Sequence, residues 1–395
     1  MQILVLNSGS SSLKFQLFSM PNETILCSGL IERIGFEDAF FKFKTQNGVI
    51  ELKTPILNHN MGLKLLSEQL LDKKTGVITS PDDISVVGHR VVHGGKHFSQ
   101  TTEITTAIKE KIKALSILAP LHNPANLEGI EVAEKVFPNA KQVAVFDTAF
   151  HQTIPEYAYK YAIPNEFLDK YNIRLYGFHG TSHKYVSEKT IEFLGKKESK
   201  IITIHLGNGC SMTAVKNGKS IDHSLGFSPL SGLIMGTRSG DIDPSIIFYL
   251  HERLGIEIEE IKSILQKKSG MLGLTGFSDL REIEAQALKG DKLCELALLM
   301  NAYRIKKYIG AYATILNGLD AIVFTAGIGE NSEKMRELVC ENLDFLGIVL
   351  DKDKNKIRSS GIRILNHNDS KVQVLVVPTN EELEIAKQAM ALFKN

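Results

Sequence analysis

Residues 1–20 read MQILVLNSGSSSLKFQLFSM, in which two apolar runs flank a turn of small polar residues. Both runs are short and bounded by turn residues, which is typical of strands and predicts strands at 3–6 and 13–18. Another strand is expected at 24–31, and residues 40–53 alternate apolar and polar side chains around Asn47-Gly48, as a hairpin does. The chain is therefore expected to open with a sheet.

The same order recurs about 200 residues later. Residues 200–222 read KIITIHLGNGCSMTAVKNGKSID, which predicts strand, Gly-rich turn, strand and a hairpin turn at Asn217-Gly218. The recurrence predicts a duplicated α/β domain with a cleft between the copies, and 395 residues suit two domains better than one. Helices are expected at 61–71, 244–254, 257–268, 291–317, 331–343 and from 379, and further strands at 84–92, 142–147, 319–327 and 372–378.

Composition excludes several classes of protein. The chain has 46 basic and 45 acidic residues, a balance that gives no reason to expect a nucleic acid or an anionic membrane as partner. The four cysteines are scattered without a CxxC pair, so neither a zinc site nor a disulfide framework is predicted and a reducing compartment is expected. No apolar run approaches the length of a membrane span, which favours a cytoplasmic location.

The turn from Asn7 to Lys14 could hold a phosphate group. It is not a P-loop, because Leu13 stands where that motif needs a Gly before the Lys. The N–H groups of Gly9 and Ser10, with the Ser hydroxyls, could donate to phosphate oxygens, although a plain Ser-rich hairpin turn is the alternative. Two further Gly-rich turns, HLGNG at 205–209 and TAGIGEN at 325–331, shift the balance toward nucleotide binding.

Two arginines and a histidine stand in polar, Gly-rich surroundings. Arg90 ends the strand VVGHR and is interpreted as an anion clamp, with an exposed surface arginine as the alternative. Arg238 lies in the loop MGTRSGDIDP. His179 precedes a helix that Thr181 or Ser182 is expected to cap. The four-residue spacing of His89, His93 and His97 resembles that of metal ligands on a helix, but the Val and Gly residues between them disfavour a helix and therefore a metal site.

Two acidic residues also stand at strand or helix ends. Asp147 follows the strand QVAVF, where a catalytic acid or a helix cap is expected. In TNEEL, Thr379 and Glu382 fit a capping box, which leaves Glu381 to hold Mg²⁺ or to lie exposed in the first helical turn. The residues alone favour the exposed side chain.

The strings LVLNSGSSSLKF, GFHGTSHKYV, HLGNG, MGTRSGDIDP and TAGIGEN occur in this order, and the chain resembles the acetate and propionate kinase family from residue 2 to about residue 390. The resemblance implies an α/β fold of two duplicated ribonuclease-H-like domains, as in the sugar kinase, actin and chaperone ATPase superfamily, with a nucleotide cleft between them. It implies a first domain of 1–149 plus 381–395, which carries the acyl-kinase residues and the closing helix, and a second of 150–380, which binds nucleotide and dimerises. The implied reaction is reversible, Mg²⁺- or Mn²⁺-dependent transfer of phosphate from ATP to acetate, giving ADP and acetyl phosphate.

The resemblance also implies roles for individual residues. Implied as catalytic are Asp147, His179, Arg238, Arg90 and His122. Implied to bind the acyl substrate are Arg90, Val92, Leu121, Phe178 and Pro229. Implied to bind the nucleotide are Lys14, Ser10, Ser12, His205, Leu206, Gly207, Asn208, Gly209, Asp279, Leu280, Arg281, Gly327, Ile328, Gly329, Glu330 and Asn331. Implied to organise the metal are Asn7 and Glu381, which reverses the interpretation of Glu381 from the residues alone.

Acetate is ionised at neutral pH and needs no base, so Asp147 is hypothesised to orient Arg90, His179 or a metal-bound water. Propionate kinase of the same family is the nearest alternative. A chaperone-like or filament-forming ATPase of the superfamily is a more distant one, and a chaperone is expected to have a substrate domain after the nucleotide domains, where this sequence has only the closing helix. A nucleotide-binding regulator without catalysis is a further alternative, which does not need Arg90, His179 and Arg238 together.

Overall fold

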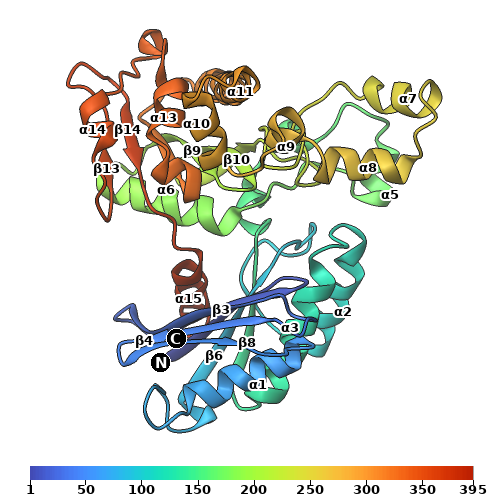
Figure 1. Ribbon diagram of the computed structural model, residues 1–395, viewed down its shortest axis with the longest axis vertical. Helices are drawn as coiled ribbons and strands as arrows, with labels where there is room; N and C mark the ends of the chain where they lie inside the picture. The colour runs from blue at the N-terminus through green and yellow to red at the C-terminus, as the bar shows by residue number, and fades with distance from the viewer. Residues whose placement is uncertain (395) are drawn as a thin grey trace. The chain divides into compact units, whose positions relative to one another are not determined.

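The computed structural model describes residues 1–394 (Figure 1). The chain divides into two compact units, Met1–Phe150 with the segment from Asn380 onward, and His151–Thr379. Asn395, the last residue of the predicted 381–395 segment, lies outside the described residues. Among the residues described, no helix combines the length and apolar character needed to cross a bilayer.

The first unit is an eight-stranded sheet in the order β5-β4-β3-β2-β1-β6-β8-β7. Its strands are β1 (Gln2–Ser8), β2 (Ser12–Ser19), β3 (Thr24–Glu32), β4 (Phe40–Thr45), β5 (Gly48–Lys53), β6 (Ile84–Val91), β7 (Thr102–Glu103) and β8 (Lys141–Phe146). Its helices are α1 (His59–Leu70), α2 (Thr106–Ala114), α3 (Asn123–Val136) and α15 (Glu381–Leu392). The predicted opening strands and the hairpin at Asn47-Gly48 are confirmed.

Helices cover both faces of this sheet. Leu4 and Val87 belong to a buried cluster with Leu63 and Leu66 of α1, which places one face of the sheet against α1 and α3. Gly88 faces the other way, where α15 approaches so closely that a Cβ on Gly88 would lie 2.8 Å from Ile385. Figure 1 shows α1 and α15 on opposite sides of the sheet. Because both faces are covered, the central strands β1 and β6 are buried along most of their length.

The second unit contains a six-stranded sheet in the order β11-β10-β9-β12-β14-β13. Its strands are β9 (Lys200–Leu206), β10 (Cys210–Lys216), β11 (Lys219–His223), β12 (Ala321–Thr325), β13 (Arg363–Ile364) and β14 (Gln373–Val376). Its helices are α4 (Glu156–Tyr159), α5 (Glu166–Tyr171), α6 (Gly180–Leu194), α7 (Ser245–Glu252), α8 (Ile258–Lys267), α9 (Gly270–Thr275), α10 (Leu280–Leu288), α11 (Lys292–Leu316), α12 (Ala326–Asn331), α13 (Glu333–Cys340) and α14 (Lys352–Lys356). Figure 1 shows α6 and α11 on opposite sides of this sheet.

The two sheets share one topology. Within β3-β2-β1-β6-β8-β7 the successive pairs are antiparallel, antiparallel, parallel, parallel and antiparallel. The pairs of β11-β10-β9-β12-β14-β13 follow the same sequence of directions. The predicted duplication of an α/β domain is therefore confirmed, with β4 and β5 added to the first copy.

Two predicted helix caps are wrong. Helix α15 is capped by Asn380, whose side chain accepts from the Leu383 N–H at 2.9 Å. Thr379, the predicted cap, instead lies 2.9 Å from the Ser182 hydroxyl, and its own N–H donates to Glu330. Helix α6 begins at Gly180 after His179, and no side chain caps it, because the Ser182 hydroxyl is bonded to His205 and Thr379.

Candidate active site

In the first unit, four polar side chains meet at the ends of neighbouring strands. Asn7 lies near the end of β1, Arg90 near the end of β6, and Asp147 directly after β8. These three strands are adjacent and parallel, so their carboxyl ends share one edge of the sheet. Glu381 is the first residue of α15, which packs across β1 and β6. The topology thus brings together residues that are up to 374 positions apart.

Arg90 and Asp147 form the strongest contact in this cluster. The Arg90 Nε donates to both carboxylate oxygens of Asp147 at 3.0 and 3.1 Å, and Nη2 donates to Oδ2 at 2.5 Å. The Asp147 side chain is 1% exposed and the Arg90 side chain 21%. A fork of this kind fixes the plane of the guanidinium as well as its position. Asp147 therefore sets the direction in which Arg90 presents its remaining N–H groups.

Asn7 and Glu381 lie on other sides of the same guanidinium. Nη1 of Arg90 is 3.4 Å from Oδ1 of Asn7, and Nε is 3.8 Å from Oε2 of Glu381. That Glu381 oxygen is buried and accepts no hydrogen bond. Burial, opposed by Arg90 and reinforced by Asp147, raises the pKa of Glu381 to about 7. A buried carboxylate oxygen without a hydrogen-bond donor has lost its hydration, and a bound cation could compensate for that loss.

The turn between β1 and β2 differs in one respect from prediction. The N–H of Gly9, expected to be available to a phosphate, donates to the Ser12 carbonyl at 2.8 Å and closes the turn. His59 of α1 donates to the Gly9 carbonyl at 2.8 Å, and Asn126 of α3 donates to the Ser8 carbonyl at 2.7 Å. Ser10 and Lys14 are exposed and Ser12 is partly so. Hydrogen bonds to its backbone thus stabilise the turn, while the side chains of Ser10 and Lys14 are exposed to solvent.

In the second unit, His179, Arg238 and the turn between β9 and β10 lie together. His179 adopts a left-handed conformation with φ 56° at the start of α6, and its ring stacks on His205 at 4.5 Å. A Cβ added to Gly209 would lie 3.3 Å from His179 Nε2 and 3.8 Å from Arg238 Nη1. Arg238 donates to the Pro229 carbonyl at 3.0 Å, and burial lowers its pKa. The side chain of Leu206, by contrast, lies in the core.

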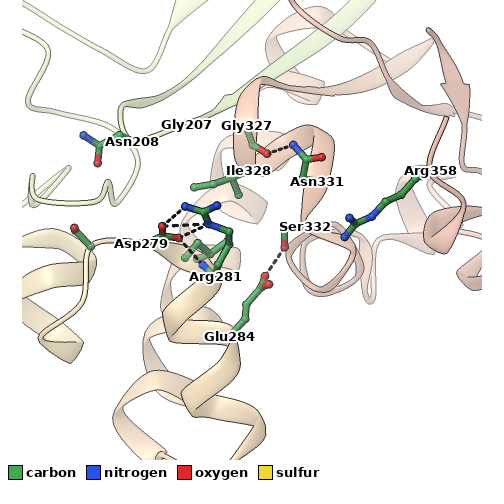
Figure 2. A pocket seen from close by; sticks show the side chains of 12 residues that line it. Gly207, Asn208, Asp279, Arg281, Glu284, Gly327, Ile328, Asn331, Ser332 and Arg358 are labelled. Atoms are coloured by element: carbon green, nitrogen blue, oxygen red, sulfur yellow. Dashed lines mark hydrogen bonds and ion pairs between the residues drawn. The ribbon is translucent and has the colours of Figure 1, made fainter. Parts of the chain in front are cut away.

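A cavity of about 750 Å³ opens beside this turn (Figure 2). Figure 2 shows α10 on one side, α12 on the other, and Asn208 at the end that belongs to the β9–β10 turn. Its volume falls within the range typical of small-molecule sites. It is lined by Gly207, Asn208, Ser278, Asp279, Leu280, Arg281, Glu284, Gly327, Ile328, Asn331, Ser332 and Arg358.

Hydrogen bonds hold the walls of this cavity. Asp279 caps α10 and accepts from the Arg281 guanidinium, with the shortest contact at 2.5 Å, as the dashed lines in Figure 2 indicate. Ser332 donates to Glu284, whose pKa is raised by burial. Behind α12, buried Arg336 donates to the Gly329 carbonyl at 2.9 Å. Hydrogen bonds therefore connect several of the side chains that line the cavity.

Eight of the predicted nucleotide-binding residues line this cavity, and four further lining residues, Ser278, Glu284, Ser332 and Arg358, were not predicted. The eight are Gly207, Asn208, Asp279, Leu280, Arg281, Gly327, Ile328 and Asn331. Gly329 and Glu330 are on the same helix but do not line the cavity. The Gly329 carbonyl accepts from Arg336, and the Glu330 side chain accepts from the Thr379 N–H. The missed Arg358 and Glu284 had no sequence signal, since each stands in an ordinary charged stretch.

The residues expected around the acyl group fall in both units. Val92 is buried and Leu121 is 61% exposed in the first unit, beside His122 at the start of α3. Phe178 is 2% exposed in the second unit, where Pro229 contacts Arg238.

Fold and site together define a class of protein: an α/β chain of two like-built units, with a charged cluster at the strand ends of one and a nucleotide-sized cavity in the other. The Acetokinase family model matches residues 2–387, and the chain belongs to that family. It is 62% identical to an acetate kinase of Flavobacterium johnsoniae over the full length of both chains.

Solved structures of this family have the same fold. The crystal structure of Porphyromonas gingivalis acetate kinase matches with a TM-score of 0.94 at 46% identity, covering 100% of both chains. A propionate kinase from Francisella tularensis matches with a TM-score of 0.93 at 45% identity, covering 99% of both chains. The predicted α/β fold and the predicted family are confirmed.

Proposed function

We propose that the protein catalyses the reversible transfer of phosphate from ATP to acetate, giving ADP and acetyl phosphate. The observation that carries this proposal is the match, over the whole chain, to relatives named acetate kinase. The geometry of each unit supports it, because the first offers cations and amides to anions and the second offers a cavity for a nucleotide.

The central problem of this reaction is the repulsion between a carboxylate and an anionic phosphoryl group. In our proposal, Arg90 binds the carboxylate of acetate, and Asp147 holds the guanidinium in the required plane. Arg238 and His179 donate to the oxygens of the phosphoryl group as it passes in line to the acetate oxygen. His122 assists at the same group. No side chain has to remove a proton from acetate, so Asp147 is a positioning residue rather than a base.

Asn7 and Glu381 are proposed to hold Mg²⁺ or Mn²⁺. Within residues 1–394 no group of three His, Cys, Asp or Glu side chains is arranged to hold a metal alone. Mg²⁺ does not require one, because it keeps several waters and binds through one or two protein oxygens plus phosphate. The unpartnered Oε2 of Glu381 and the Oδ1 of Asn7, each close to Arg90, are oxygens of this kind. When bound, the ion supplies charge neutralisation at the phosphates.

The cavity of the second unit is proposed to bind the nucleoside part of ATP and ADP. Ile328 and Leu280 give it apolar surface, while Asn331, Ser278 and Asp279 offer polar groups at its rim. The Gly207–Gly209 turn leads from this cavity toward His179 and Arg238. At Gly207 and Gly209, where no Cβ stands in the way, phosphates that follow this turn could approach the backbone closely. In the first unit, Ser10, Ser12 and Lys14 are proposed to donate to the same phosphates.

Val92, Leu121, Phe178 and Pro229 are proposed to surround the methyl group. One extra methylene in an apolar pocket changes binding by only about 1–3 kcal/mol, so propionate should be a poorer but real substrate. Propionate kinase activity is the second candidate, and the match to the Francisella tularensis propionate kinase favours it over activities outside the family.

We also propose a cytoplasmic homodimer formed through the second unit. The long helix α11 exposes Leu293 at 63%, Leu296 and Leu299 at 53% each, and Tyr303 at 67%. Single exposed apolar residues are ordinary, but a row on one helix is typical of a protein interface. Sedimentation of the wild type and of a Leu296→Glu, Tyr303→Glu variant tests the dimer, which the variant should dissociate.

The function is tested by incubating the protein with ATP, Mg²⁺ and acetate, propionate or butyrate, and trapping acyl phosphate with hydroxylamine. The highest kcat/KM with acetate is the expected result. A preference for propionate would keep the mechanism and change the substrate, and absence of hydroxamate from every acid would refute the proposal.

A further inference from the structure

Two buried histidines of the second unit have no part in the proposed mechanism. His151 is 0% exposed and His223, at the end of β11, is 2% exposed. Their rings lie 4.1 Å apart at 36°. Both reach the same peptide segment, that of Phe178, the residue before His179.

Each histidine bonds a different backbone group of Phe178. Nε2 of His151 lies 2.9 Å from the Phe178 carbonyl oxygen, and Nε2 of His223 lies 3.1 Å from the Phe178 nitrogen. The N–H and the carbonyl of Phe178 are thus bonded by two histidines that lie 45 and 27 positions away in the sequence. We call His151 and His223 the Phe178 clamp.

The backbone partners determine the proton on each ring. A carbonyl oxygen only accepts, so His151 must carry a proton on Nε2, and its Nδ1 lies 2.9 Å from the Ser220 hydroxyl. A backbone N–H only donates, so Nε2 of His223 must be bare, and Nδ1 donates to Thr213 at 2.8 Å. Nε2 therefore carries a proton in His151 and none in His223. Burial and the neighbouring histidines hold the pKa of His223 well below its usual value, which keeps that ring neutral.

The clamped segment needs an external hold because its backbone is unusual. Gly177 has φ +74° and His179 has φ +56°, so Phe178 stands between two left-handed residues. A histidine rarely adopts this conformation unless its surroundings impose it. A Cβ on Gly177 would lie 2.7 Å from the His151 ring, which shows how tightly the ring seats against the segment.

We propose that His151 and His223 are positioning residues, which fix the Phe178 peptide and thereby both the Phe178 wall of the acyl pocket and the His179 ring. This inference rests on the proposed function for the roles of Phe178 and His179. Its consequence is that one pair of buried rings governs turnover and acyl-group discrimination together.

Matched amide variants test the clamp at each histidine. The amide of Gln reaches the position of Nε2 and can keep the bond to Phe178, whereas the shorter Asn reaches only the position of Nδ1 and keeps the bond to Ser220 or Thr213. His151→Gln, His151→Asn, His223→Gln and His223→Asn are compared for melting temperature, kcat, and kcat/KM with acetate and propionate. The melting temperatures of each Gln and Asn pair should fall by similar amounts.

The Asn variants should lose on the order of 10²-fold in kcat, because misplacement of a reacting group by about 1 Å has that effect. Their ratio of acetate to propionate kcat/KM should also change, while the Gln variants recover most of both quantities. Equal losses of activity in the Gln and Asn variants, or a loss of melting temperature alone, would overturn the clamp.

A measurement without substrate separates this inference from the proposed function. In long-range ¹H–¹⁵N spectra of the wild type at pH 7, His151 should carry a proton on Nε2, and His223 should be the Nδ1–H tautomer. An unprotonated Nε2 at His151, or a protonated Nε2 at His223, would refute the clamp even in an active enzyme. Correct tautomers with no acyl phosphate from any acid would instead refute the proposed function and, with it, the roles given to Phe178 and His179.

Discussion

The contact between Asp147 and Arg90 makes the sharpest prediction about mechanism. Asp147→Asn keeps the size of the side chain but removes the charge that receives three N–H contacts from Arg90. Hydrogen bonds to charged groups contribute about 1.5–3 kcal/mol, which corresponds to roughly 10- to 150-fold in kcat/KM for acetate. Since Asp147 is 1% exposed, water does not replace the lost contact.

A double-mutant cycle distinguishes positioning from base catalysis. If Asp147 acts only through Arg90, then Arg90→Ala and the double variant Arg90→Ala, Asp147→Asn should have nearly the same kcat/KM, since Asp147 has nothing left to position. Arg90→Ala should also raise the KM for acetate. Glu382→Gln is the matched control, because Glu382 influences Arg90 only by its charge, and it should cost less than about 3-fold.

Steady-state assays of acetyl phosphate formation, at saturating ATP and varied acetate, supply the four values of the cycle. A double variant whose loss equals the product of the two single losses would show that Asp147 acts independently of Arg90. An Asp147→Asn enzyme with near-full turnover would refute both the positioning role and the importance of the residue.

Three further changes have expected outcomes. Arg238→Ala should lower kcat by on the order of 10³-fold or more with little change in the KM for acetate, as for other arginines that act on a transferring phosphoryl group. Equally small losses in Arg238→Ala and Arg90→Ala would contradict the separate roles proposed for the two arginines. Ile328→Glu places a carboxylate in the cavity of Figure 2 and should weaken ADP binding, measured by calorimetry, by at least about 10-fold while leaving the KM for acetate unchanged. Burial lowers the pKa of His89 from 6.5 to about 4, so the unfolded chain takes up a proton at this residue more readily than the folded one. The free energy of unfolding should therefore be highest above pH 6.5 and should fall by about 3 kcal/mol as the pH falls toward 4. Urea unfolding of His89→Gln between pH 4 and 7 should therefore depend less on pH than that of the wild type or of the control His97→Gln, which changes an exposed residue.

Local signals in the sequence predicted the sheets well. The hairpin at Asn217-Gly218 is an example, because both residues have positive φ, at 54° and 76°, and Asn-Gly is the pair that tolerates this conformation best. The recurrence of strand, Gly-rich turn and strand likewise depends on neighbouring residues only. The family resemblance then supplied the site residues, whose individual weak signals could not have selected them.

Most of the predictions that were wrong depend on contacts between residues that lie far apart in the sequence. Thr379 and Asn380 are equally plausible caps from sequence, and the choice follows from Ser182 and Glu330, which engage Thr379 from elsewhere in the second unit. The N–H of Gly9 was predicted to donate to a phosphate, but it donates to the Ser12 carbonyl across the turn. The Phe178 clamp had no sequence signal either, since His151 and His223 stand in unrelated segments.

The duplication explains why the proposed functional residues stand where they do. In the first sheet they follow β1, β6 and β8, as Asn7, Arg90 and Asp147 do. In the second sheet the corresponding strands are β9, β12 and β14, and these are followed by the Gly207 turn, by α12 with Ile328, and by the segment that leads to Glu381. Parallel strands point their carboxyl ends to one edge, so each copy inherits a place where loops of unrelated sequence meet. In the first unit a charged cluster lies at this edge, and in the second unit a cavity does. In the proposed function, the same topology therefore supplies both the phosphate-binding and the nucleoside-binding parts of one reaction.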